Sequence, residues 1–311
     1  MIPLKIYGLI GYPVKHSLSP KMHNAAFCSL NINAEYRLFE VPPERLEEFL
    51  LDPNAKFEDI EGNSFPAGDV LGFNITIPHK VPALIKNITI VTSLEVVLSG
   101  AVNTVKRDNG KLHYRNTDGV GFVKSLREDL KFYTSDKNIL IFGCGGAGRA
   151  VIAGLTCEGA NVQKIYIYDT NKEAVESAKK HFSQFQDVIN KLKFISSEQI
   201  PNSINECQLL VNASPVGMKD DDGSVIDKSL LHKDLYVYDV VYNRETQLIK
   251  DAKSLGLHFK DGLGMLLHQG AAAFEFWTGQ EAPIEIMRKA LEEELAILKR
   301  IGLPESYRGR A

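Results

Sequence analysis

The 311-residue sequence has only four cysteines, and their spacing is neither that of a metal site nor that of a disulfide framework. This usage is typical of a reduced cytoplasmic chain in which thiols serve as small apolar residues. No apolar run is long enough to span a bilayer. The N-terminus lacks the charged and apolar regions of a secretory signal. We therefore expect a cytoplasmic protein without a membrane partner.

An excess of charge of one sign is also absent. The formal net charge is -3, from 36 basic and 39 acidic residues, so there is no electrostatic footprint for nucleic acid and we expect no such partner. The sequence also lacks internal repeats and low-complexity tracts. Its 44% hydrophobic and 24% charged content is ordinary for a globular protein, and the length suggests about two domains.

The segment from Gly72 to Lys80 alternates apolar and polar residues, which predicts a strand. The expected faces are Phe73, Ile75 and Ile77 on one side, and Asn74, Thr76 and Lys80 on the other. Pro78 cannot donate to a ladder, so the strand should end near it, with Lys80 just beyond, where catalytic groups often lie in α/β proteins. The polar face serves either a small polar ligand or, in an edge strand, the solvent.

Strand and helix patterns alternate up to this segment, which predicts a mostly parallel sheet with covering helices. We expect strands over residues 5–10 and 36–41 and a helix over residues 43–51. Another helix is expected over residues 20–30, capped by Ser17 or Ser19. The polar stretch 52–69 reads as a long loop.

A second α/β unit is expected from about residue 116, with the pattern of a doubly wound nucleotide-binding domain. The predicted helices cover residues 119–130, 149–158 and 173–185. The predicted strands cover residues 138–142, 164–168, 192–195, 209–212 and 236–241. Two amphipathic helices, 269–277 and 283–301, follow and should pack back on the first domain.

The six residues from Gly143 to Gly148 fit G-x-G-x-x-G between a predicted strand and a predicted helix. Glycines there permit a tight turn and close approach of the backbone to a pyrophosphate at the helix N-terminus. The pattern favours dinucleotide binding. The alternative is a tight turn that binds nothing.

Asp169 closes the next predicted strand, at the spacing from Gly148 of a carboxylate that binds the adenosine ribose hydroxyls and repels a 2′-phosphate. This favours NAD over NADP. Alternatively, Asp169 only caps the helix that follows. Residues 170–172 leave room for a phosphate, so NADP stays possible.

Four further polar segments occur where a core would be apolar. They read G-x-P-x-x-H-S-x-S-P-x-x-H-N from Gly11, A-x-N-T from Ala101, N-T-D-G from Asn116 and G-x-x-M-L-x-x-Q-G from Gly262. The N-x-T-x-P-x-K motif runs from Asn74 to Lys80, in the strand described above. Taken in their order along the chain, these five motifs resemble the shikimate dehydrogenase family over nearly the whole sequence.

The resemblance implies a discontinuous substrate-binding domain, residues 1–112 with 265–311, and a Rossmann domain, residues 113–264. It implies reversible hydride transfer between a nicotinamide and shikimate, giving 3-dehydroshikimate on the route to chorismate and aromatic amino acids. No metal is required. Lys80 and Asp118 would be the catalytic pair, because a lysine amine can relay the hydroxyl proton.

The resemblance also implies the binding residues. Substrate would be bound by Ser17, Ser19, Asn74, Thr76, Asn103, Tyr242 and Gln269. The cofactor would be bound by Gly143, Gly145, Gly146, Ala147, Gly148, Asp169, Ala213 and Gly262.

The sequence departs from the family at four places. The run after Tyr242 is one residue short and lacks a proline, the 52–69 stretch is longer than usual, and Tyr114 replaces a frequent glycine. The run from Tyr168 to Asn171 replaces the Asn-Arg-Thr of many NADP-using members, which again favours NAD. The leading hypothesis is an NAD-preferring shikimate dehydrogenase, monomeric or homodimeric. The alternatives are a broad-specificity quinate/shikimate dehydrogenase and a silent ligand-binding regulator, which would be expected to have lost Lys80 or Asp118.

Overall fold

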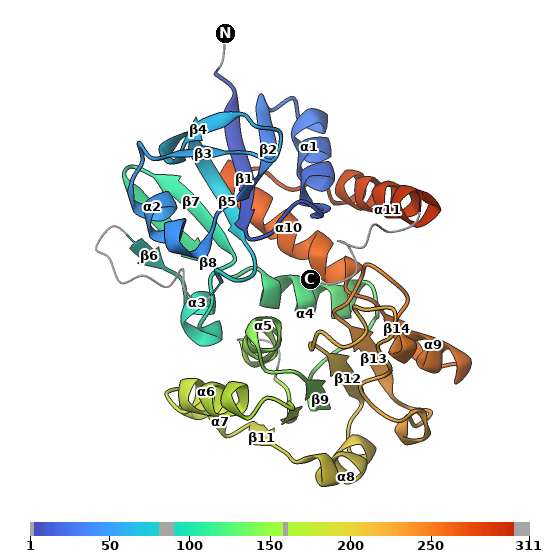
Figure 1. Ribbon diagram of the computed structural model, residues 1–311. Helices are drawn as coiled ribbons and strands as arrows, with labels where there is room; N and C mark the ends of the chain where they lie inside the picture. Colours follow the sequence, from blue (N-terminus) through green and yellow to red (C-terminus); the bar gives the residue numbers. More distant parts are fainter. Residues whose placement is uncertain (1–2, 81–89, 158–160, 302–311) are drawn as a thin grey trace. The chain divides into compact units, whose positions relative to one another are not determined.

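The computed structural model describes residues 3–80, 90–157 and 161–301 (Figure 1). The chain forms two compact units, and it passes from the first to the second after Thr117 and returns after Leu266. The domain boundaries predicted from the sequence, after residues 112 and 264, lie five and two residues earlier. The first crossing lies later because β8 (Lys111–Arg115) and the two residues after it are hydrogen-bonded within the first unit.

The first unit contains a six-stranded sheet in the order β2-β1-β5-β7-β8-β6. The remaining strands are β1 (Lys5–Gly11), β2 (Ala34–Glu40), β5 (Val70–Ile75), β6 (Ile90–Thr92) and β7 (Thr104–Asp108). The expected parallel pairing holds for β1 with β2 and β5 and for β6 with β8, but β7 runs antiparallel to both neighbours. It reverses because Asn109 and Gly110, both at positive φ, form the tight turn of a β7–β8 hairpin.

Strand β5 lies between β1 and β7, so the edge-strand interpretation is wrong. The predicted alternation holds from Phe73 to Ile75, and all three side chains are buried, including that of Asn74. The strand then ends, and Ile77 is 47% exposed instead of sharing the buried face. A polar side chain therefore lies inside the first unit on a central strand.

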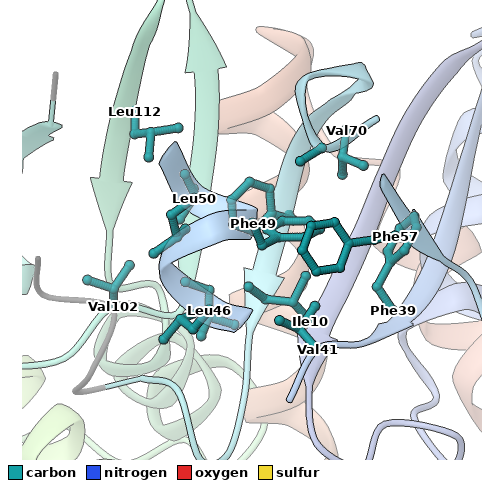
Figure 2. Packing of buried hydrophobic residues seen from close by; sticks show 14 of the residues in the cluster. Ile10, Phe39, Val41, Leu46, Phe49, Leu50, Phe57, Val70, Val102 and Leu112 are labelled. Atoms are coloured by element: carbon teal, nitrogen blue, oxygen red, sulfur yellow. The ribbon is translucent and has the colours of Figure 1, made fainter. Parts of the chain in front are cut away.

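One face of this sheet is covered by α2 (Leu46–Leu51), which follows the short η1 (Pro43–Arg45). Figure 2 shows Phe49 of α2 at the centre of the apolar cluster. Its ring lies 4.9 Å from that of Phe57 and 5.2 Å from that of Phe73, both edge-on. Aromatic pairs in this geometry add to the burial energy.

The stretch 52–69 is not the long loop that its composition predicts. It contains a hairpin of β3 (Lys56–Glu58) and β4 (Ser64–Pro66), followed by η2 (Ala67–Asp69). The Asp59 carboxylate forms the turn by accepting from the backbone N–H groups of Glu61 and Asn63, at 2.9 and 2.8 Å, and it pairs with Arg37.

The other face of the sheet carries α1 (Ser19–Ser29) and α10 (Leu263–Thr278), with α11 (Ile284–Ile301) against α1 (Figure 1). Lys21 pairs with Glu294 at 3.5 Å, and Trp277 Nε1 donates to the Val105 carbonyl at 2.9 Å. A Cβ on Gly72 would lie 2.5 Å from the Trp277 ring, so β5 needs a glycine there. The C-terminal helices pack on the first unit, as predicted. Helix α3 (Leu94–Ser99) precedes β7 in the chain and contacts β8.

The second unit is built on a parallel sheet in the order β11-β10-β9-β12-β13-β14, which is the doubly wound order that the sequence predicts. The strands are β9 (Asn138–Phe142), β10 (Lys164–Tyr168), β11 (Leu192–Phe194), β12 (Leu209–Asn212), β13 (Tyr236–Asp239) and β14 (His258–Lys260). The helices are α4 (Asp118–Glu128), α5 (Gly146–Thr156), α6 (Lys172–Phe182), α7 (Gln186–Ile189), α8 (Ile200–Asn205) and α9 (Gln247–Ser254), with η3 (Ser197–Gln199) and η4 (Lys228–Leu230).

Helix α5 begins at Gly146, three residues before the predicted start, because the glycine segment itself supplies the first turn. In the described part of the chain, no helix is long and apolar enough to cross a bilayer.

The first prediction concerns the aromatic cluster under α2. Phe49→Ala should lower the free energy of unfolding by about 3–5 kcal/mol, because the cavity removes contacts to several rings at once. Leu94→Ala, at a side chain that is 67% exposed, is the control and should change it by less than about 0.5 kcal/mol. Urea denaturation of both variants measures the difference, and equal losses would show that the cluster does not stabilise the sheet.

Candidate functional site

A buried hydrogen-bond network begins at Asn74 in β5. Its Nδ2 donates to the Asn103 carbonyl at 3.2 Å and to Thr104 Oγ1 at 3.0 Å, and its Oδ1 accepts from the Tyr36 hydroxyl at 2.8 Å. The amide therefore joins β2, β5 and the start of β7. Since burying an amide without partners is costly, these bonds explain how a central strand tolerates an asparagine.

Asn103 extends the network to two more segments. Its Oδ1 accepts from the Thr117 backbone N–H at 2.8 Å and from Thr104 Oγ1 at 2.9 Å. Its Nδ2 donates to Thr117 Oγ1 at 3.0 Å and to Gln269 Oε1 at 3.4 Å. The structure thus brings together three predicted substrate residues, Asn74, Asn103 and Gln269, from β5, the start of β7 and α10.

Ser19 joins the same network through Tyr36, whose hydroxyl it hydrogen-bonds. Helix α1 holds Tyr36 in two further ways. Asn24 bonds both backbone groups of Tyr36, donating to its carbonyl at 3.2 Å and accepting from its N–H at 2.7 Å. The His23 ring stacks on the Tyr36 ring at 4.4 Å. Burial raises the pKa of Tyr36, so its hydroxyl stays protonated and can donate.

The capping prediction for α1 needs correction. The N-cap residue is Leu18, with no side-chain cap, and Ser19 is already the first helical residue. Ser17 Oγ accepts from the Ser19 backbone N–H at 3.2 Å. The Ser17 hydroxyl hydrogen therefore faces away from the helix backbone, at a helix start that favours anions.

Lys80 and Thr76 lie beyond the end of β5, and both are half-buried. The Lys80 carbonyl accepts from the Val102 N–H at 2.7 Å, which places Lys80 beside the segment that carries Asn103. The preceding residue, His79, is buried and its Nε2 lies 2.7 Å from the Val41 carbonyl. Burial lowers the pKa of His79, so its ring is neutral.

Asp118 is the first residue of α4 and is buried. It follows Thr117 directly in the chain, so one peptide bond joins it to the network of the first unit. Asp118 itself belongs to the second unit, whereas Lys80 belongs to the first.

In the second unit, the glycines between β9 and α5 are of two kinds. Gly143 has φ +97 and a Cβ there would lie 2.8 Å from the Ala213 backbone, while a Cβ on Gly148 would lie 2.2 Å from the Gly143 carbonyl oxygen. These two glycines are required by the fold. A Cβ on Gly145 or Gly146 would meet no atom within 4 Å, so packing does not require a glycine at either position and the space beside them is open to a ligand. This open cradle at a helix N-terminus fits a dinucleotide pyrophosphate.

Asp169 does not cap the next helix, because the N-cap of α6 is Asn171. Instead Asp169 Oδ2 accepts from the Cys144 backbone N–H at 2.9 Å, which ties the end of β10 to the glycine loop. Burial and the neighbouring Asp169 raise the pKa of Cys144 to about 12, so its thiol is protonated.

A buried carboxylate, Asp239, connects the loops that carry Ala213 and Tyr242. Its Oδ1 accepts from Asn212 Nδ2 at 2.9 Å, and its Oδ2 accepts from Thr246 Oγ1 at 2.6 Å. Thr246 also caps α9, so the shortened run after Tyr242 ends at a residue that is held by both Asp239 and the helix backbone.

Gly262 is required by packing, since a Cβ there would lie 1.9 Å from the Val240 carbonyl oxygen.

Sequence reasoning missed three members of the network, Tyr36, Thr104 and Thr117. The two threonines follow the asparagines of the A-x-N-T and N-T-D-G motifs, and this repeated Asn-Thr pair is a signal that they act with them. Tyr36 lies outside those motifs. Its position follows from the parallel register that pairs Tyr36 with Tyr7 and Leu9 with Asn74.

Comparison with known proteins gives a consistent result. Two family models match the chain: the shikimate dehydrogenase substrate binding domain over residues 9–105, and the shikimate 5′-dehydrogenase C-terminal domain over residues 262–292. A shikimate dehydrogenase (NADP(+)) of Methanopyrus kandleri is 40% identical over 295 residues, which cover 93% of this chain and 96% of that protein.

Two solved structures have the same fold. Shikimate 5-dehydrogenase from Listeria monocytogenes, in complex with shikimate and NAD, has a TM-score of 0.78 at 32% identity, with 93% of this chain and 96% of that chain covered. Quinate dehydrogenase from Corynebacterium glutamicum, in complex with NAD, has a TM-score of 0.78 at 28% identity, with 93% and 99% covered.

The second prediction concerns the pH dependence of stability. Burial raises the pKa of Asp239 from 3.8 to about 6, so the folded protein keeps this proton up to a higher pH than the unfolded chain does. The stabilising contribution is fully present below pH 3.8 and is lost as the pH rises through about 6. Asp239→Asn should therefore gain stability relative to the unmodified protein by about 2 kcal/mol between pH 4 and pH 7.

Urea denaturation across this pH range measures the difference between the two proteins. Asp234→Asn removes the same charge from an exposed position and is the control. A difference between the Asp239→Asn variant and the unmodified protein that stays constant with pH would contradict the prediction.

Proposed function

The chain belongs to the shikimate dehydrogenase family, and on that premise we propose that it catalyses the reversible, nicotinamide-dependent oxidation of shikimate to 3-dehydroshikimate. The observation that carries the proposal is the buried network of the first unit. It joins Ser19, Asn74, Asn103 and Gln269, four of the residues that the family pattern assigns to substrate. A small acid with several hydroxyl groups requires such convergent polar groups.

On the substrate side, each residue has a role suited to its chemistry. Ser17, beside the start of α1, would donate its hydroxyl to the substrate carboxylate, and Ser19, whose hydroxyl bonds Tyr36, would lie beside it. The ring hydroxyls would be bound by Asn74, Thr76, Asn103, Tyr242 and Gln269.

Lys80 and Asp118 would handle the proton. As a hydroxyl is oxidised, its oxygen must release a proton, and the Lys80 amine would take it, returning it in the reverse direction. Asp118 would orient the amine and accept a hydrogen bond from the reacting hydroxyl. The nicotinamide, when bound, supplies the hydride chemistry, so the protein needs only to position groups and move one proton.

The dinucleotide would bind along the second unit. Its pyrophosphate would meet the open backbone of Gly145 and Gly146. The remaining residues assigned to it are Gly143, Ala147, Gly148, Asp169, Ala213 and Gly262.

We propose that NAD is preferred, although the Methanopyrus kandleri relative is named for NADP(+). The support is the Asp169 carboxylate, which the Cys144 N–H holds at the glycine loop and which would repel a 2′-phosphate while accepting from ribose hydroxyls.

A second candidate is a broad-specificity quinate/shikimate dehydrogenase. It is favoured by the same carboxylate, because the structurally similar quinate dehydrogenase is a complex with NAD. The two candidates differ in whether quinate is oxidised as well as shikimate.

The third prediction tests the activity. The purified protein should reduce NAD with shikimate, and Lys80→Ala should lower kcat by about 10²- to 10⁴-fold, because the proton acceptor is removed. Binding of shikimate, measured by calorimetry, should change little. Assays with shikimate and quinate, each with NAD and NADP, are followed by the absorbance of the reduced nicotinamide.

Lys111→Ala removes an exposed lysine from the same unit and is the matched control, with no change expected. Turnover of quinate as fast as that of shikimate would favour the second candidate. Absence of turnover with every combination would contradict both enzymatic candidates and support a ligand-binding regulator. Near-normal turnover by Lys80→Ala would show that another group moves the proton.

The fourth prediction tests the cofactor preference. Asp169→Asn keeps an oxygen that can accept from the Cys144 N–H but removes the charge. The ratio of kcat/KM for NAD to that for NADP should fall about tenfold or more, since about 1.4 kcal/mol of repulsion corresponds to tenfold. Glu173→Gln, an exposed carboxylate at the start of α6, is the control for charge. An unchanged ratio would show that Asp169 does not select the cofactor.

A further inference from the structure

The orientation of the Asn74 amide can be deduced from its partners. Nδ2 lies 3.2 Å from the Asn103 carbonyl oxygen, which can only accept, so the nitrogen must be on that side. Its second hydrogen goes to Thr104 Oγ1. Oδ1 consequently faces Tyr36, and because an amide oxygen can only accept, the Tyr36 hydroxyl is the donor.

The same logic sets the direction of the neighbouring bonds. Tyr36 has one hydroxyl hydrogen, which is used on Asn74, so Ser19 must be the donor in the Ser19–Tyr36 bond. At the other end, Thr104 receives from Asn74 and donates to Asn103 Oδ1. The donors therefore run in one direction, from Ser19 through Tyr36, Asn74 and Thr104 to Asn103.

This direction limits what Asn74 can offer a ligand. Both of its N–H groups are used within the protein, and only the second lone pair of Oδ1 remains. Asn74 can therefore accept a hydrogen bond from a ligand hydroxyl, but it cannot donate one to a ligand carbonyl or ether oxygen. A site with fixed acceptors rejects a ligand that lacks the matching hydrogen, because the buried acceptor is left unpaired.

We propose that Tyr36 is a specificity-determining positioning residue, which holds the Asn74 amide so that the site selects a substrate hydroxyl opposite Asn74 Oδ1. The proposal rests on the proposed function, in which a polyhydroxylated cyclic acid occupies this site. Tyr36 acts through Asn74 and not on the reacting atoms.

Helix α1 supports this role. Ser19, His23 and Asn24 belong to one sequence motif, and all three contact Tyr36: at its hydroxyl, its ring and its backbone. Neither ring nitrogen of the fully buried His23 has a hydrogen-bond partner, so His23 contributes through the stacked face of its ring. The motif therefore has a second purpose besides presenting Ser17 and Ser19, which is to fix Tyr36.

The fifth prediction tests this positioning role in the full-length protein, by calorimetric binding of shikimate and of analogues that each lack one ring hydroxyl. The penalty of an analogue is its loss of affinity relative to shikimate. The analogue whose penalty disappears in Asn74→Ala lacks the hydroxyl that Asn74 binds. Tyr36→Phe should reduce that analogue's penalty at least fivefold, because Asn74 Oδ1 then loses the hydroxyl that holds it in place. It should raise KM for shikimate about tenfold while kcat stays within about threefold.

A double variant separates positioning from general damage. If Tyr36 acts through Asn74, Tyr36→Phe should add nothing to KM in an Asn74→Ala background, whereas additive effects would overturn the proposal. Tyr7→Phe is the matched control, since Tyr7 is a buried tyrosine that also packs against Trp277, and it should leave the analogue penalties unchanged.

Two further outcomes are distinguishable. If Tyr36→Phe does not fold, Thr104→Val tests the same claim, because it frees one Asn74 N–H and should also reduce the analogue penalty. An unchanged penalty in that variant would overturn the proposal. Failure of the unmodified protein to bind shikimate would instead contradict the proposed function.

Discussion

A buried asparagine amide on a central strand needs a partner for each of its polar atoms, and this need links the first unit's scattered segments. Asn74 takes its partners from β2 and from the start of β7, and through them it reaches α1, the residues before α4, and α10. Each unmet bond would cost about 1–3 kcal/mol. The motifs lie far apart in the sequence because the network needs one or two residues from each of these segments, and none of them can be supplied locally.

Strand β5 separates stability from chemistry by its two faces. Phe73 and Ile75 face the apolar cluster around Phe49, where packing of rings stabilises the sheet, while Asn74 faces the polar network. Because side chains alternate along a strand, a shift of register by one residue would exchange the faces and bury the amide among rings. The apolar cluster therefore holds the register on which the polar site depends.

The sequence predicts the buried parallel strands well because such strands read as short apolar runs, and β9, β10 and β12 have the predicted bounds. It does not predict the β3–β4 hairpin, whose strands are three residues long and depend on the rings of Phe57 and Phe65 meeting Phe49 and Phe39. Motif comparison finds Asn74, Asn103 and Gln269, which meet in the structure. Tyr36 is missed because its role arises from strand register, and the capping role given to Ser19 is wrong because its side chain bonds Tyr36.

In the second unit, the glycines that the fold requires can be distinguished from those that packing does not require. A glycine that would clash with the backbone, as at Gly143 and Gly148, is explained without any ligand. Gly145 and Gly146 have no such explanation, so only they argue for a phosphate beside the helix. Asp169 has both a structural and a proposed functional role, since its carboxylate accepts from the Cys144 N–H and is the group that we propose binds the ribose. A substitution of Asp169 would therefore alter the glycine loop as well, because the carboxylate that we propose discriminates the phosphate also holds the loop backbone at Cys144.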